Sequence, residues 1–392
     1  MKDYGFMPDA VGKRHTRQED TFTGTGRLDA HSPTEMGRAW TSATGTISGN
    51  AAIHTETLGA EQATGTLTVG VFYIITASEV NHFYTGSAIG DYFKATATTG
   101  LDANNKVQAI TLSSILTLSD LGFSEGRYWF TPKITTAGAL GGVVVMTNDS
   151  VASTDGLWCY YDDTAGKLQV FKRVAGVDTP LLSTAITYVA GKQGCLVYDK
   201  SAGKIWAFYN NAIVGTAQAL TDASIINNTW HGIMSTGDAS VDALAFASLG
   251  YGADLFDPGA GTFESGTYSW VPSAGNTIEN DAGQLKITYV NHADGAQLTF
   301  RDTRDLNSDL TVGELYRFDF AGRVNSGSNV GLTYYNGIGS WLTFKIFTET
   351  DLTASVGYFI AQSATGMIIY QGGTMGAGEI IWLDNLVLKQ VQ

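Results

Sequence analysis

The sequence is poor in charge, in proline and in cysteine. Charged residues make up 15% of the 392 residues, and only 6 prolines and 2 cysteines are present. So few cysteines exclude a small disulfide-stapled scaffold. The charge is also one-sided, because 37 acidic and 23 basic residues give a formal net charge of −14. Nucleic acid and anionic membrane are therefore not expected as partners, since both require clustered Lys and Arg.

Long apolar runs are missing as well. No stretch approaches the roughly 20 residues that a membrane span needs. The opening residues MKDYGFMPDAVGKRHTRQ contain no apolar core of the kind that marks a signal peptide. We therefore expect synthesis in a cytoplasm and no insertion into a membrane.

Catalytic motifs are the third absence. The sequence has no G-x-S-x-G elbow, no H-E-x-x-H, no glycine-rich phosphate loop and no paired C-x-x-C. A glycan-cleaving sandwich needs two carboxylates about 5–10 Å apart. The nearest match to the Glu-x-Asp-x-x-Glu strand of laminarinase-like enzymes is ETDLTA, in which Ala354 replaces the second Glu after Glu349 and Asp351. We therefore expect no enzymatic activity.

The residues that are abundant are those of an all-β protein. Hydrophobic residues make up 44% of the chain, and 47 residues are glycine. Short apolar runs alternate with turn signals such as DDTAGK, DKSAGK and YNNA, and no segment sustains a helical period. We predict an all-β fold with two β-sandwich (jelly-roll) domains, a small β-module inserted in the first, and an extended N-terminal arm.

Changes of composition predict the domain boundaries. The first sandwich is expected at 19–250, with the inserted module at 63–112, where VGVFYIIT and DYFKATAT are strong strand signals. The linker GYGADLFDPGAG then opens a last domain at 251–392.

Residues 1–18 precede these domains as a polar arm. The basic centre of the arm, GKRHTRQ, contains Lys13, Arg14 and Arg17. One interpretation is an attachment peptide that becomes ordered on a partner, and the alternative is a disordered tail.

The two cysteines, Cys159 and Cys195, each lie in an apolar strand-like run. A third such run separates them, so the two would not be neighbours in a simple meander. We predict two buried free thiols, with a disulfide as the alternative.

Several aromatic residues are candidates for carbohydrate binding, because a ring face can stack on the apolar face of a pyranose. The candidates are Tyr334, Tyr335 and Trp341 in GLTYYNGIGSWLTF, and Trp206 and Tyr209 in KIWAFYNN; LWCYYDD offers Trp158 and Tyr160 in the same way. In a strand, neighbours such as Tyr334 and Tyr335 point to opposite faces, so one of them is expected in the core. For each single ring, a place in the core is the alternative.

Three parts of the chain resemble known families. The runs DTFTGTGRLD, GLWCYYDDTAGKLQVFKRVAGVDTPLL and SVDALAFASLG resemble the concanavalin A-like/laminin-G sandwich. The inserted stretch GTLTVGVFYIIT…LDANNKVQAI is similar to a small β-module common in bacteriophage virion proteins. The last domain, opening on GTFESG and closing on IIWLDNLVLK, resembles the jelly-roll carbohydrate-binding modules.

The jelly-roll resemblance implies a structural Ca²⁺ ion. In such modules an acidic residue near the first strand and an Asp on the last strand meet around the ion, and Glu264 and Asp384 occupy those places here. Asp20 and Asp242 match the same places in the first domain, although Ala243 replaces the usual Asn. The alternative for both pairs is ordinary surface or capping carboxylates.

Together these features predict a non-enzymatic bacteriophage virion surface protein: a fibre, spike or decoration subunit of the head or tail. The arm would bind other virion proteins, the sandwiches would bind host-surface polysaccharide, and the assembly would be a homo-oligomer. The alternative is a secreted bacterial carbohydrate-binding protein or an accessory module of a glycan hydrolase. A third possibility is a purely architectural subunit with no ligand.

Overall fold

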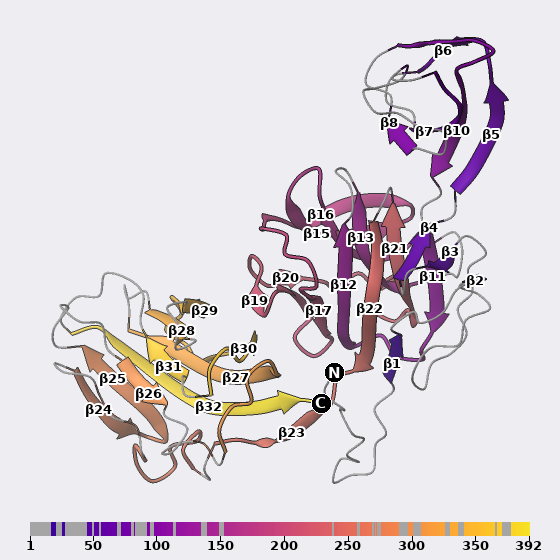
Figure 1. Cartoon of the computed structure of the whole chain (residues 1–392). Coiled ribbons are helices and arrows are strands. Elements are labelled where there is room, and N and C mark those ends of the chain that lie inside the picture. The colour runs from indigo at the N-terminus through magenta and orange to yellow at the C-terminus, as the bar shows by residue number, and fades with distance from the viewer. Residues whose placement is uncertain are drawn as a thin grey trace.

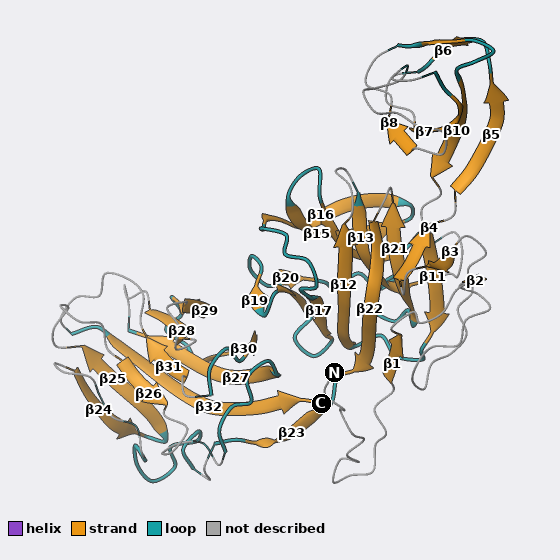
Figure 2. Cartoon of the chain, in the orientation of Figure 1, coloured by secondary structure: helices purple, strands orange, loops and turns teal. Residues whose placement is uncertain are grey.

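The structure is a computed structural model of the whole chain (Figure 1). It describes residues 17–20, 26–27, 45–48, 51–54, 56–68, 72–79, 82, 92–94, 98–112, 115–134, 139–148, 153–236, 239–256, 259–268, 270, 272, 276–289, 297–300, 306, 308–325, 330–335, 341–364, 367–370 and 378–392. Within these ranges every regular element is a β-strand (Figure 2), which confirms the predicted all-β fold. The same ranges contain no helix long and apolar enough to cross a membrane.

The first sandwich consists of two antiparallel sheets. The β12 sheet runs in the order β19 (Ala212–Ile213), β18 (Lys204–Tyr209), β17 (Gly194–Asp199), β12 (Gly126–Ile134), β22 (Ala239–Ser248), β4 (Ala51–His54), β3 (Gly45–Ser48) and β2 (Gly26–Arg27), with β1 (Arg17–Asp20) on β22 and β20 (Gln218–Ala219) on β18. The β13 sheet runs in the order β11 (Ile115–Asp120), β21 (Trp230–Thr236), β13 (Leu140–Thr147), β14 (Gly156–Asp162), β15 (Lys167–Val174) and β16 (Val177–Ala185). Side chains from the inner faces of both sheets form one core.

The inserted module forms sheets of its own and stands off from this sandwich (Figure 1). Its strands are β5 (Glu56–Gln62), β10 (Lys106–Leu112), β7 (Phe72–Ala77) and β8 (Tyr92–Lys94) in one sheet, and β6 (Gly65–Thr66) and β9 (Gly100–Leu101) in another. The predicted start at 63 is wrong, because β5 pairs with β10 inside the module and the described module therefore begins at Glu56.

The second sandwich follows the first almost without a linker. Its β32 sheet runs in the order β24 (Asn276–Asp281), β25 (Gln284–Tyr289), β32 (Ile380–Val391), β27 (Leu315–Val324) and β30 (Thr353–Ile360), with β23 (Tyr251–Asp254) also on β32. Its β28 sheet runs in the order β26 (Gln297–Phe300), β31 (Met367–Tyr370), β28 (Val330–Tyr335) and β29 (Trp341–Phe347). The first and last strands, β23 and β32, pair with each other, so the two ends of this domain lie side by side.

Local sequence explains the hairpins that shape these sheets. The turns of DDTAGK and DKSAGK contain Gly166 and Gly203 at φ 61° and 60°, and the YNNA turn contains Asn210 and Asn211 at φ 50° and 65°. Glycine and asparagine tolerate this left-handed region best. All three predicted turns connect neighbouring strands of the first sandwich.

Two smaller predictions are also settled. Cys159 and Cys195 are both buried and free, as predicted. Arg17, expected in the arm, instead lies in β1 and pairs with Ala247 of β22, so the arm ends before it. Lys13 and Arg14 lie outside the described residues.

Candidate functional site

Three of the predicted sugar platforms are buried. Tyr209 lies in the core of the first sandwich, and its hydroxyl donates to the carbonyl of Val189. Tyr334 lies in the core of the second sandwich against Phe359, with 4.2 Å between ring centroids. Trp206 is only 3% exposed, because the second sandwich covers it. The prediction is therefore wrong for these three rings, whose faces are packed against protein.

For the other two predicted platforms, Tyr335 and Trp341, the structure describes the backbone position but not the side chain. They are directly opposite each other in the β28–β29 pair. Their side chains lie outside the described residues. Tyr334 is the member of the Tyr334–Tyr335 pair that lies in the core. Tyr335 therefore remains the candidate sugar platform of this pair.

The candidate calcium pair of the second sandwich lies where the opening segment meets the last strand. The amide of Leu386 in β32 donates to the carbonyl of Gly261 at 2.9 Å, and a Cβ on Gly261 would collide with the carbonyl oxygen of Leu386. Beside this contact, the amide of Asn385 donates to the Asp384 carboxylate at 2.7 Å. Burial raises the pKa of Asp384, and the Glu264 carboxylate raises it further. The two carboxylates thus repel each other across the contact between the chain ends.

A calcium ion would suit this arrangement chemically. Carboxylate and backbone carbonyl oxygens are the ligands that Ca²⁺ prefers, and a cation would remove the repulsion. The described residues contain no group of three or more His, Cys, Asp and Glu side chains placed to hold a metal ion, so backbone oxygens would have to complete the shell.

The corresponding pair in the first sandwich has another arrangement. Asp242 lies 3.6 Å from the Lys133 ammonium, so a side-chain cation already faces this carboxylate. Asp20 lies in β1 opposite Leu244, two residues along β22 from Asp242, and its side chain is outside the described residues.

The partial glycosidase-like motif does not form an acid–base pair. The Glu349 carboxylate accepts a hydrogen bond from the Lys345 ammonium at 2.8 Å, which holds the pKa of Glu349 down at about 2. A carboxylate that stays ionised is a poor proton donor to a glycosidic oxygen.

An apolar junction joins the two sandwiches, and sequence reasoning did not predict it. It brings β17 and β18 of the β12 sheet against β27, β30 and β32 of the second sandwich. Its buried members are Cys195, Val197, Trp206 and Phe208 from the first sandwich and Leu315, Tyr358, Ile360 and Val391 from the second. Trp206 and Tyr358 meet at its centre, with ring centroids 4.6 Å apart.

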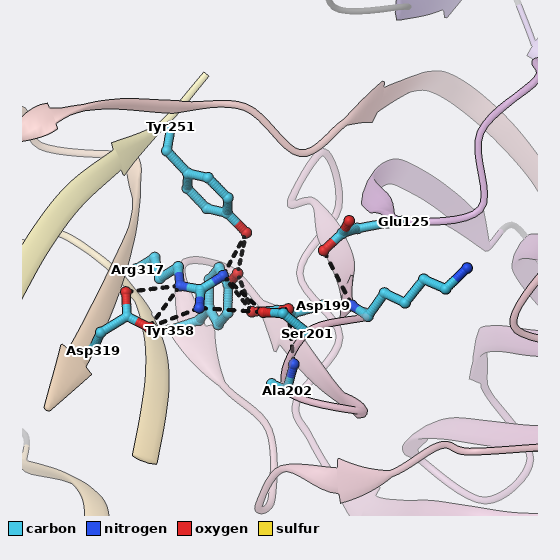
Figure 3. Close-up of polar contacts among 9 residues, drawn as sticks. Glu125, Asp199, Ser201, Ala202, Tyr251, Arg317, Asp319 and Tyr358 are labelled. Carbon is cyan, nitrogen blue, oxygen red and sulfur yellow. Dashed lines mark hydrogen bonds and ion pairs between the residues drawn. The ribbon is translucent and has the colours of Figure 1, made fainter. Parts of the chain in front are cut away.

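A charged network lies within this junction (Figure 3). Asp199 of β17 is fully buried and lies 2.8 Å from the guanidinium of Arg317 in β27. The Tyr358 hydroxyl donates to the same carboxylate at 2.9 Å. Arg317 also donates to the Tyr251 hydroxyl at 2.9 Å and to the Asp319 carboxylate at 2.7 Å. Burial raises the pKa of Tyr251 to about 12 and that of Tyr358 as well, so both phenols stay protonated at neutral pH.

One signal in the sequence could have revealed this junction. Most strands of a two-layer sandwich bury alternate residues, as β25 (QLKITY) does. In contrast, β17 (GCLVYD) is buried at every position, and β18 (KIWAFY) at all but the first. The pattern is not confined to the junction, because β13 (LGGVVVMT) is also buried at all but its first position. For β17 and β18, the second sandwich supplies the outer cover.

Comparisons with known proteins give only distant structural likenesses. No protein-family model matches the sequence, and no curated protein matches it. The carbohydrate-binding module CBM66 from Bacillus subtilis is similar at 13% identity and a TM-score of 0.26, over 36% of this chain and 83% of that one. The apo CBM1 of BiXyn10A is similar at 18% identity and 0.26, over 33% and 94%. A variant of CBM29-2 complexed with mannohexaose is similar at 16% identity and 0.26, over 36% and 92%. These scores are too low to carry a function over to this chain.

Proposed function

We propose that the chain is a non-enzymatic bacteriophage virion surface protein that contributes to adhesion to host-surface glycan. The observation that carries the proposal is the junction between the sandwiches. Domains within one chain are expected to move relative to each other unless their interface is large and hydrophobic. Here eight buried apolar residues and a buried Asp199–Arg317 pair hold the sandwiches in one arrangement. A rigid double sandwich suits a projection that must keep its shape, such as a spike or fibre subunit.

The chain termini of the second sandwich reinforce this rigidity. The amide of Gln392 donates to the carbonyl of Gly250 between the domains at 2.8 Å, and Arg127 of the first sandwich donates to the carbonyl of Val391. The rival function, a secreted bacterial carbohydrate-binding protein or an accessory module of a glycan hydrolase, differs from this proposal in predicting that the chain is absent from virus particles.

The surface charge supports glycan as the ligand class. A net charge of −14 disfavours polyanions such as nucleic acid, whereas neutral polysaccharide is indifferent to it. Tyr335 and Trp341, opposite each other in β28 and β29, remain candidate contacts in the second sandwich.

Attachment to the particle is assigned in this proposal to the residues before β1, with Lys13 and Arg14 at their centre. Other virion proteins would be the partners, in a homo-oligomer. Deleting residues 2–16 should leave the melting of both sandwiches unchanged and abolish incorporation into particles. Incorporation at normal copy number would refute this role.

Glycan adhesion is tested with host cells. Purified full-length chain, labelled with a fluorophore, should bind host cells, and polysaccharide extracted from those cells should compete with it. The alternative of a purely architectural subunit predicts no binding to cells at all.

A further inference from the structure

The outer face of the β13 sheet carries an apolar and aromatic cluster that is separate from the core of the sandwich. Leu118, Val144 and Trp158 are its buried members, and Tyr160, Phe171, Trp230 and Met234 pack against them while remaining partly exposed. We call these residues the aromatic face. The core of the sandwich lies on the opposite side of this sheet, where Leu157 and Cys159 alternate with Trp158 and Tyr160.

The register places much of the aromatic face in a straight row across the sheet. Directly opposed neighbours run from Leu118 through Gly232, Val144, Trp158 and Phe171 to Pro180, one residue from each of six strands. Adjacent strands lie about 4.8 Å apart, so the row has one residue for each step of that length, with no side chain at the Gly232 step. Beside this row, the Tyr160 ring lies parallel to Phe171 within 6°, with 5.9 Å between centroids.

Polar side chains border the row. Arg173 lies over the Trp158 ring at 4.4 Å and pairs with Asp178 through two hydrogen bonds of 2.6 and 2.8 Å. On the other side of Phe171 along β15, the Gln169 amide donates to the Asp162 carboxylate. Burial raises the pKa of Tyr160 to about 12, and the nearby Asp162 and Asp178 carboxylates add to it, so its hydroxyl stays a donor. The border thus offers planar donors and acceptors next to flat rings.

Among the described residues, the second sandwich packs on the β12 sheet and not on the β13 sheet. The second sandwich packs on β17 and β18 of the β12 sheet (Figure 1), which is where Trp206 and Phe208 are buried. On the β13 sheet the corresponding aromatic residues stay partly exposed. The partly exposed rings of Tyr160, Phe171 and Trp230 lie on one face with carboxylate, amide and guanidinium groups beside them. Such a face matches a chain of sugar rings, whose apolar faces stack and whose hydroxyls need both donors and acceptors.

We infer that the aromatic face binds an extended saccharide, with Phe171, Trp230 and Tyr160 as its stacking contacts and Gln169, Asp162 and the Arg173–Asp178 pair as its polar contacts. This inference rests on the proposed glycan adhesion and assigns it to the first sandwich. The candidates from the sequence, Tyr335 and Trp341, lie in the second sandwich.

The test is binding of the full-length chain to an array of defined bacterial and plant oligosaccharides, followed by calorimetric titration with the best-bound one. Phe171→Ala and Trp230→Ala should each weaken binding about tenfold or more, the scale set by loss of one aromatic stack. Val312→Ala, at a 53% exposed position of the second sandwich, is the control and should leave affinity unchanged.

If the alanine variants fold poorly, two more conservative variants still test the inference. Phe171→Leu keeps an apolar side chain but removes the flat ring, and should also weaken binding about tenfold. Tyr160→Phe keeps the ring and removes only the hydroxyl, and should weaken binding less than Phe171→Leu. Thermal melts of each variant show that the fold is retained.

The possible outcomes distinguish failure of this inference from failure of the proposed glycan adhesion. Binding that is unaffected by the Phe171 and Trp230 variants but lost in Tyr335→Ala or Trp341→Ala would overturn the inference and leave glycan adhesion standing. A change of oligomeric state in place of lost glycan binding would mean that a second copy of the chain covers this face, and would also overturn it. No binding to any oligosaccharide would overturn both.

Discussion

At the scale of single residues, Asp199 has the most demanding position among the described residues. It is fully buried between two domains, where its carboxylate accepts hydrogen bonds from the Ser201 hydroxyl and the Ala202 amide of its own domain. From the other domain, Arg317 pairs with this carboxylate and the Tyr358 hydroxyl donates to it. A buried ion pair contributes little net stability compared with apolar packing, but removal of one partner leaves the other charge uncompensated. The pair therefore makes the domain arrangement specific, because Asp199 has these partners in this one arrangement.

Arg317→Ala should consequently destabilise the protein far more than loss of a surface ion pair does. We expect the free energy of unfolding to fall by about 3 kcal/mol, since Asp199 stays buried without its cation. Lys172→Ala, which removes a partly exposed pair with Asp222 (side chains 26% and 27% exposed), is the matched control and should cost about 1 kcal/mol or less. Urea denaturation followed by tryptophan fluorescence measures both, and equal losses would contradict the role given to Arg317.

A second residue-scale prediction concerns His231 in the core of the first sandwich. Its Nδ1 accepts from the amide of Met146 at 3.1 Å, and its Nε2 donates to the carbonyl of Phe123 at 2.7 Å. Burial lowers the pKa of His231 to about 4, against 6.5 for the free side chain. Because the folded state favours the neutral ring, its stabilising contribution is complete above pH 6.5 and is lost as pH falls from 6.5 towards 4.

Proton NMR titration of the histidine ring signals measures this directly. The His231 signals should stay at their neutral positions down to about pH 4, and the free energy of unfolding should fall by roughly 3 kcal/mol over the same interval. A His231 ring that titrates near 6.5 would show that it is not buried as described.

At the scale of elements, the alternation of apolar and polar residues along the chain predicted more of the structure than individual residue types did. It correctly predicted the strand-rich fold, the hairpin turns and the core position of one residue of the Tyr334–Tyr335 pair. It could not predict what buries Trp206 and Trp158, which are 3% and 7% exposed. The Arg173 guanidinium lies over Trp158 within the first sandwich, whereas Trp206 contacts Tyr358, more than a hundred positions away, and no local pattern encodes that contact.

The closing strand β32 gives the clearest element-scale prediction. If Ca²⁺ bridges Glu264 and Asp384, the ion at a hundred times its dissociation constant should stabilise the folded chain by about 2.7 kcal/mol. Chelation should then lower the melting temperature of the full-length chain, and Asp384→Asn should remove that sensitivity. Asp242→Asn, at the carboxylate that faces Lys133, should leave the response to Ca²⁺ intact. Identical melts with chelator and with excess Ca²⁺ would exclude the ion.

The inserted module is the other element whose independence can be measured. Its described strands pair only with one another, and its small core of Leu67, Tyr73, Leu101 and Val107 is separate from that of the sandwich. Replacing residues 56–112 with a short Gly/Ser linker should therefore preserve the cooperative melt of the rest, because loop length changes closure entropy by only ~0.6 kcal/mol per doubling. Calorimetry checks this, and collapse of the first sandwich would show that the module is part of its fold.

At the scale of the whole molecule, the junction turns two sandwiches into one body with two unlike faces. The second sandwich covers the outer side of β17 and β18 in the β12 sheet, whereas the aromatic face of the β13 sheet stays partly exposed. From the sequence we predicted two domains but no contact between them. An apolar run indicates that a strand is buried, but it does not indicate which other element buries it. The function proposed here depends on this union, because a projection from a particle must hold its binding face at a fixed orientation.

The most direct test of that function is mass spectrometry of particles purified by density gradient from a culture that produces the chain. A virion surface protein should co-purify with the particles at a fixed ratio to the major capsid protein, and mild protease treatment of intact particles should cleave it. Recovery of the chain only from the particle-free culture medium would contradict the proposal and favour a secreted carbohydrate-binding protein.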